Sequence, residues 1–125
     1  MTNTLMVYDC KALGKPRMTR RDAWAKRPCV LRFWDYKDHI VAEAKKQNFV
    51  LADSFLVKVH FKLPDSYSKK KKTALLGHPH QVKPDIDNIL KGLMDILKEK
   101  DQTVYKVTAE KTWAHENYIE IYNLD

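Results

Sequence analysis

The fold is most clearly decided by residues 83–97, KPDIDNILKGLMDIL. Pro84 stands where a helix begins, and Asp85 and Asp87 follow in the first turn, where the helix dipole favours negative charge. Apolar residues then recur at three- and four-residue spacing, which predicts an amphipathic helix that ends near Lys98. Its expected buried stripe is Ile86, Ile89, Leu90, Leu93, Met94 and Leu97.

The segments before this helix show regular patterns of their own. Residues 55–63 alternate strictly between apolar and polar side chains, which is typical of a half-buried strand. Residues 32–48 have apolar side chains at helical spacing, and residues 5–8 form a short apolar run of strand character. We therefore expect a strand, a helix and a second strand ahead of the acidic helix.

The remaining segments complete a small α+β domain. Residues 103–114 and 118–122 are rich in β-branched and aromatic side chains, which predicts an antiparallel hairpin. The polar tract after Pro64, with four consecutive lysines, is expected to be a mobile loop. The order β-α-β-α-β-β predicts one domain over residues 1–125, with two helices on a small mixed sheet.

Composition excludes several classes of protein. The chain has 125 residues, 44% of them hydrophobic, which suits one folded domain and argues against disorder along its length. No apolar run approaches the ~18 to 20 residues that cross a bilayer, so we expect no membrane association and a cytoplasmic location. Two cysteines, Cys10 and Cys29, are too few for a disulfide framework. With only 3 glycines, a glycine-rich nucleotide-binding loop is excluded.

Charge is distributed unevenly along the chain. The 23 basic and 16 acidic residues give a net charge of +7, divided as +6 over residues 1–50, +4 over residues 51–82 and −3 over residues 83–125. A basic surface of this kind suits a polyanion. The acidic side chains of the last third would repel a phosphate backbone unless a metal ion lies between the carboxylates and the phosphates.

Carboxylates gather around the start of the acidic helix. Asp85 and Asp87 lie near each other in sequence, and we expect the short connection after the helix to bring Asp101 back to the same end. Two unit charges about 4 Å apart repel by about 4 kcal/mol at an effective dielectric of about 20, so three converging carboxylates need a cation. Mg²⁺, or Mn²⁺ in its place, suits oxygen ligands and supports phosphodiester hydrolysis. Lys91 follows Asp87 by one turn, where it can stabilise charge in the transition state.

A structural interpretation of the same residues stays open. Two acids in a first helical turn commonly serve only the helix dipole, and Asp87, Lys91 and Asp95, four apart in turn, also suit a solvated ladder of ion pairs. We expect a structural or supporting role for Asp95. His78 and His80 have a spacing that transition metals use, but loop residues are the simpler interpretation.

The acidic stretch has a counterpart in a known family. KPDIDNILKGLMDIL, followed by KDQTV, closely resembles the signature of the RusA family of Holliday-junction resolvases, and GKPRMTRR near the N-terminus is similar to that family's basic segment. The resemblance implies a homodimeric, Mg²⁺-dependent endonuclease that nicks four-way DNA junctions in pairs during recombination and repair. It places metal-binding acids at Asp85, Asp87 and Asp101 and a catalytic lysine at Lys91. Many relatives have two adjacent acids where this chain has Lys100 and Asp101.

A junction-binding protein also needs phosphate contacts that do not depend on base sequence. The basic residues we expect to supply them are Arg17, Arg20, Arg21 and Lys26, with Lys69, Lys70, Lys71 and Lys72 as a second group. Two other functions remain open: a dimeric nucleic-acid-binding protein without catalysis, and a less selective Mg²⁺ nuclease that acts on flaps or forks.

Overall fold

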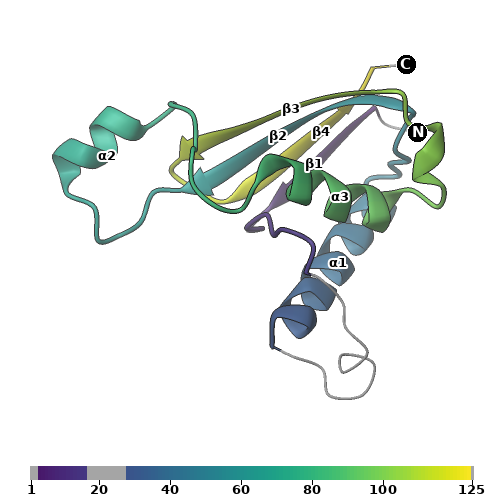
Figure 1. The fold of residues 1–125 in the computed structure, drawn as a ribbon, viewed down its shortest axis with the longest axis horizontal. Helices are drawn as coiled ribbons and strands as arrows, with labels where there is room; N and C mark the ends of the chain where they lie inside the picture. The colour runs from purple at the N-terminus through teal and green to yellow at the C-terminus, as the bar shows by residue number, and fades with distance from the viewer. Residues whose placement is uncertain (1–2, 17–27, 125) are drawn as a thin grey trace.

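The computed structural model describes residues 3–16 and 28–124 and confirms the expected α+β class (Figure 1). It contains a four-stranded mixed sheet and three α-helices in the order β-α-β-α-α-β-β. The elements are β1 (Thr4–Tyr8), α1 (Pro28–Lys46), β2 (Ser54–Lys62), α2 (Lys69–Leu75), α3 (Ile86–Leu97), β3 (Lys106–Ala114) and β4 (Tyr118–Asn123), with a 3-10 turn η2 (Asp101–Thr103) before β3.

The sheet has the strand order β1-β4-β2-β3. Strand β4 pairs antiparallel with both β1 and β2, whereas β2 pairs parallel with β3 from Ser54↔Lys106 to Lys62↔Ala114. The parallel pair is joined through α3, as a parallel connection requires a crossover. Helix α3 therefore runs back along the sheet, from the end of β2 toward the start of β3.

The predicted β3–β4 hairpin is wrong, because β2 lies between these two strands. The turn at residues 115–117 crosses the end of β2, where the Asn117 side chain accepts a hydrogen bond from Lys62 N (2.8 Å) and Ala114 O accepts one from Leu63 N (3.1 Å). Phe55 and Phe61 on β2 are almost fully buried. The most apolar strand thus occupies a central place, where it buries more surface than it would at an edge.

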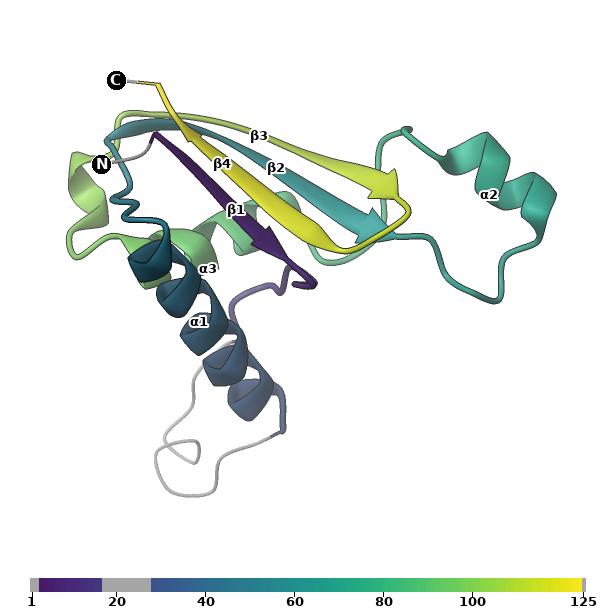
Figure 2. The same ribbon diagram turned by 180° about the vertical axis from the view of Figure 1, so that it is seen from behind.

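Helices α1 and α3 lie on the same side of the sheet, and the described helices leave its other face uncovered (Figures 1 and 2). The core lies between the two layers. Ile89 and Leu93 of α3 are completely buried, as the predicted stripe requires, while Leu90, Met94 and Leu97 are partly buried against the core. The side chains that face them from the sheet include Leu5, Val7, Val57, Val59, Ile119 and Ile121.

The lysine tract forms α2, so the prediction of a loop is wrong. Ser68 is the N-cap of this seven-residue helix, and its side chain accepts a hydrogen bond from Lys71 N. None of the α2 residues is buried. The run of like charges suggests a solvated loop, but the same residues favour a helix. Lysine has a high helix propensity, and the serine cap satisfies a backbone donor.

Residues 11–16, which follow β1, are held against α3 at close range. Lys15 N donates to Asn88 O at 3.3 Å, and the Lys15 ammonium pairs with Asp95. A Cβ at Gly14 would come within 2.5 Å of the Asn88 side-chain nitrogen, so a glycine permits this approach. Gly92 likewise lies directly under the Phe33 ring of α1. These contacts fix residues 11–16 beside the acidic helix.

Two further expectations concern the whole chain. Among the described residues, no helix is long and apolar enough to cross a membrane. Cys10 and Cys29 are free thiols, in line with the prediction that they are not bridged. Burial raises the pKa of Cys10 to about 12, which leaves it an unreactive core residue at neutral pH.

Candidate functional site

Asp85 and Asp87 lie together at the exposed start of α3. Asp85 occupies the N-cap position with an extended backbone, but its side chain makes no capping hydrogen bond, and Asp87 lies in the first turn. Both carboxylates are exposed. An aspartate at an N-cap normally accepts from a backbone N–H of the first turn, so the missing bond leaves the Asp85 oxygens available to a ligand.

The predicted ladder of ion pairs along α3 is not formed within the described residues. Asp95 pairs with Lys15, which lies in residues 11–16, instead of with Lys91. Lys91 is exposed one turn after Asp87, with no ion pair in the part of the chain that the structure describes. The pair with Lys15 is compatible with the structural or supporting role that we expect for Asp95, and Lys91 stays available near the helix start.

Asp101 lies at the other end of α3, in η2. A helix of 12 residues is about 18 Å long, so one chain does not bring Asp101 to Asp85 and Asp87 as the sequence suggested. Among the described residues, no group of three His, Cys, Asp or Glu side chains is placed to hold a metal ion. The reason is topological, because the connection that follows α3 leads to the start of β3 and away from the start of the helix.

Asp53 anchors this end of the molecule. Its Oδ1 accepts hydrogen bonds from the Lys98 ammonium at 2.6 Å and from the Thr103 hydroxyl at 2.7 Å. The first of these bonds, and then the second, hold the pKa of the Asp53 carboxyl below its usual range. Since Lys98 closes α3 and Thr103 ends η2, the Asp53 carboxylate fixes the turn that carries Asp101.

This arrangement predicts a pH dependence of stability. Because the pKa of Asp53 is lowered in the folded state, its contribution is complete above the unfolded pKa of about 3.9 and is lost as pH falls through the folded value. We expect urea unfolding to show that Asp53→Asn is less stable than wild type at neutral pH and that the difference shrinks below about pH 4. Asp65→Asn, at an exposed site, is the control. A difference that stays constant down to low pH would contradict the assignment.

His80 is not part of a metal site with His78. His80 is 5% exposed; its ring stacks on Phe61, with the centroids 4.0 Å apart, and packs against the tilted ring of Trp113, with the centroids 4.4 Å apart. Burial, and then the charge of Lys111, lower the pKa of His80, so the ring is neutral and belongs to the core. His78 is exposed and joins the edge of β3 through its backbone carbonyl, which accepts from Trp113 N.

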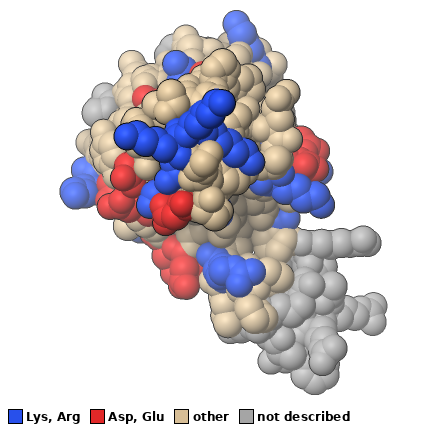
Figure 3. Space-filling view, turned by 90° about the vertical axis from the view of Figure 1, so that its left-hand side faces the viewer, with Lys and Arg blue, Asp and Glu red and all other residues tan. Residues whose placement is uncertain are grey.

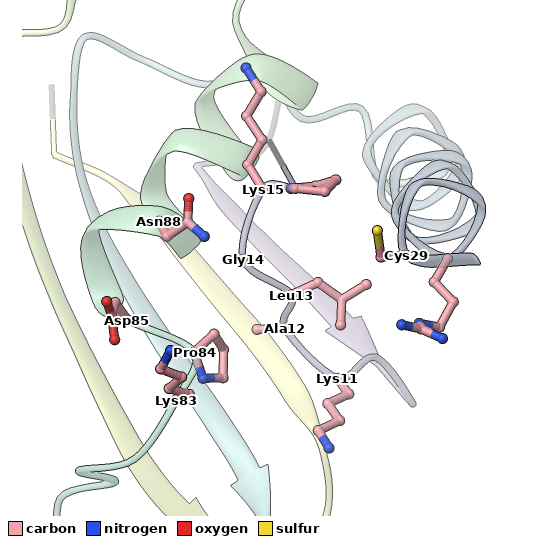
Figure 4. Close-up of a pocket in the computed structure, with 12 residues that line it drawn as sticks. Lys11, Ala12, Leu13, Gly14, Lys15, Cys29, Lys83, Pro84, Asp85 and Asn88 are labelled. Carbon is pink, nitrogen blue, oxygen red and sulfur yellow. The ribbon is translucent and has the colours of Figure 1, made fainter. Parts of the chain in front are cut away.

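A basic groove of about 590 Å³ lies beside the acidic helix start (Figure 4). One wall is formed by residues 11–16, a second by the start of α1, and a third by the chain that enters α3. Asp85 and Asn88 lie at its rim. The cations that line it are Lys11, Lys15, Arg32 and Lys83. The Lys15 ammonium already pairs with Asp95. The other three cations next to two carboxylates suit a phosphodiester whose negative charge they neutralise.

The predicted DNA contacts fall in two regions. Arg17, Arg20, Arg21 and Lys26 lie outside the described residues, so their role stays a prediction. The lysines of α2 lie at the far end of the molecule, where Figure 3 shows basic side chains gathered on the surface. Lys71 also lies over the Tyr67 ring, 3.8 Å from its centroid.

Sequence reasoning missed two sets of residues. Lys83 and Arg32 were counted in the charge of the chain, but nothing in the pattern placed them in one groove. Lys111 was also missed, although its position in the sequence could have indicated a role. On β3 it lies two residues from both Ala109 and Trp113, so it faces the same side of the sheet as these two residues, which pack against the core. A lysine in an inward-facing register of a strand needs partners for its ammonium.

An acidic helix start beside a basic groove suits a protein that binds and processes nucleic acids. Comparison with protein families identifies the family: residues 11–122 match the family described as Endodeoxyribonuclease RusA, and the chain belongs to the RusA family. This family consists of Holliday-junction-resolving endodeoxyribonucleases, as the acidic signature predicted. A search of the curated proteins found no match.

Proposed function

We propose that this chain resolves four-way DNA junctions by paired nicks, as an Mg²⁺-dependent endonuclease in the cytoplasm. The observation that carries the proposal is the uncapped Asp85 carboxylate next to Asp87, at the rim of a basic groove. This donor set fits a hard divalent cation, because both side chains are exposed carboxylates without competing partners among the described residues. Both carboxylates lie within residues 11–122, the part of the chain that matches the RusA family.

Each residue of the site then has a distinct role. Asp85 and Asp87 hold the cation, and Asp101 supplies a third carboxylate. When bound, Mg²⁺ supplies Lewis-acid stabilisation to a phosphorus centre under attack by water. Lys91 stabilises negative charge on the phosphate oxygens. The groove cations hold the strand so that its phosphodiester meets the carboxylates in one orientation, which supplies the positioning that hydrolysis needs.

We propose a two-fold dimer as the active form, for two reasons. Paired nicks in strands of like polarity need two sites related by symmetry. The separation of about 18 Å along α3 also keeps Asp101 from the helix start of its own chain. A site that uses all three acids therefore takes Asp85 and Asp87 from one protomer and Asp101 from its partner.

Metal removal tests this function directly. With a labelled four-way junction, we expect paired nicks in Mg²⁺ or Mn²⁺, no nicks in EDTA, and binding that persists without metal because the basic side chains supply it. Tight binding without cleavage in any divalent ion would contradict the proposal and favour a binding protein. Cleavage of flaps and linear duplex at the rate of the junction would instead favour a less selective nuclease.

A further inference from the structure

Lys111 lies on the helix-facing side of β3, and its ammonium donates hydrogen bonds to the chain that enters α3. Its Nζ donates to Val82 O at 2.7 Å and to Pro84 O at 2.8 Å. The backbone of the same residue takes part as well, because Lys111 O accepts a hydrogen bond from His80 N at 3.0 Å. One residue of the sheet thus holds residues 80–84 at three points.

The held segment leads directly to the two carboxylates. Pro84 immediately precedes Asp85, and Asp87 follows two residues later. Lys111 and both aspartates line one surface depression at the start of α3, together with His80. Because His80 is held in turn by its contacts with the rings of Phe61 and Trp113, the segment is fixed to the core at its beginning and to Lys111 at its end.

The bonds also explain why a lysine occupies this register. Its alkyl stem lies among the core-facing side chains of β3, and an ammonium offers three donors. Two of those donors go to carbonyl oxygens that a helix start does not satisfy. Methionine would fill the stem but leave both carbonyls without this donor, whereas arginine would keep several donors.

We propose that Lys111 is a positioning residue: it fixes the Val82–Pro84 backbone and thereby sets the carboxylates of Asp85 and Asp87 for metal binding. The part of this inference that concerns metal and cleavage rests on the proposed function. The part that concerns the backbone does not.

The test compares Lys111→Met and Lys111→Arg with Lys106→Met, which removes an exposed lysine from the same strand. Hydrogen exchange of the amides of residues 82–89 reports the backbone directly, and we expect it to be about tenfold faster in Lys111→Met only. Mn²⁺ affinity from electron paramagnetic resonance should fall about tenfold, and kcat on the junction about 10²-fold, with KM unchanged. Lys111→Arg should recover most of each loss.

Unchanged exchange at residues 82–89 in Lys111→Met would overturn the inference, whatever happens to cleavage. So would a uniform rise in exchange across the whole protein with Mn²⁺ affinity intact, because that result marks a role in global stability alone. If the wild type neither binds Mn²⁺ nor cuts the junction, the proposed function fails while the exchange data still decide the role of Lys111. Lys111→Gln, which keeps a polar group, gives the same comparison should Lys111→Met not fold.

Discussion

Replacing Asp87 with asparagine is expected to lower kcat for junction cleavage on the order of 10³-fold and to leave junction affinity within about threefold of wild type. Asparagine has nearly the shape of aspartate, so the start of α3 keeps its packing. It lacks the negative charge that a hard cation requires of its ligand. We expect DNA affinity to come mainly from lysines and arginines such as those that line the groove. Loss of one negative charge does not weaken phosphate contacts of this kind.

The measurement is single-turnover cleavage of a labelled four-way junction, with binding followed separately by fluorescence anisotropy in Ca²⁺. Asp38→Asn is the matched control, because Asp38 is also an exposed aspartate on a helix but lies on α1. We expect it to cut at the wild-type rate. Wild-type cleavage by Asp87→Asn would show that the carboxylates at the start of α3 serve only the helix dipole, and the proposed site would be wrong.

Much of the fold follows from local periodicity. The alternation of residues 55–63 predicts β2 to within one residue at each end, since the observed strand is Ser54–Lys62. The stripe on α3 predicts its two completely buried residues, Ile89 and Leu93. Such patterns are reliable because a single buried face imposes one spacing on the sequence.

Strand pairing does not follow from the same patterns. The sequence from β3 to β4 has every local feature of a hairpin, but β2 lies between the two strands. Local spacing says which side chains face the core and carries no information about which strand lies next in the sheet. That choice depends on burial of β2 and on the crossover through α3, which are both long-range effects.

Only part of the candidate site could be predicted, because local sequence patterns do not report contacts between residues far apart in the chain. Asp85, Asp87 and Lys91 are neighbours on one helix, so their proximity could be read from the sequence, and the structure places all three at or near the start of α3. The relation of Asp101 to them depends on where the chain goes after Leu97, and it goes away from the helix start. Lys111 acts on this site from the sheet, at a separation of about 24 to 29 residues that no local pattern reports.

An experiment with mixed dimers distinguishes an active site shared between two protomers from an active site formed within one protomer. Asp87→Asn and Asp101→Asn are each expected to be inactive as homodimers. In mixed dimers formed by co-expression, one site takes its intact Asp87 from one protomer and its intact Asp101 from the other, while the second site carries both substitutions. About half of the dimers are mixed and half of their sites are intact, so nicking should return to roughly a quarter of the wild-type level.

The products of this experiment carry further information. A dimer with one intact site makes single nicks, so we expect nicked junctions to accumulate in place of fully resolved duplexes. Mixing Asp85→Asn with Asp87→Asn is the matched control, because both substitutions lie at the start of α3 and every site in every mixture then carries at least one of them. If the first mixture recovers no activity, shared sites are excluded. The three acids would then have to meet within one protomer through movement of the turn that Asp53 now holds, or Asp101 would act outside the site.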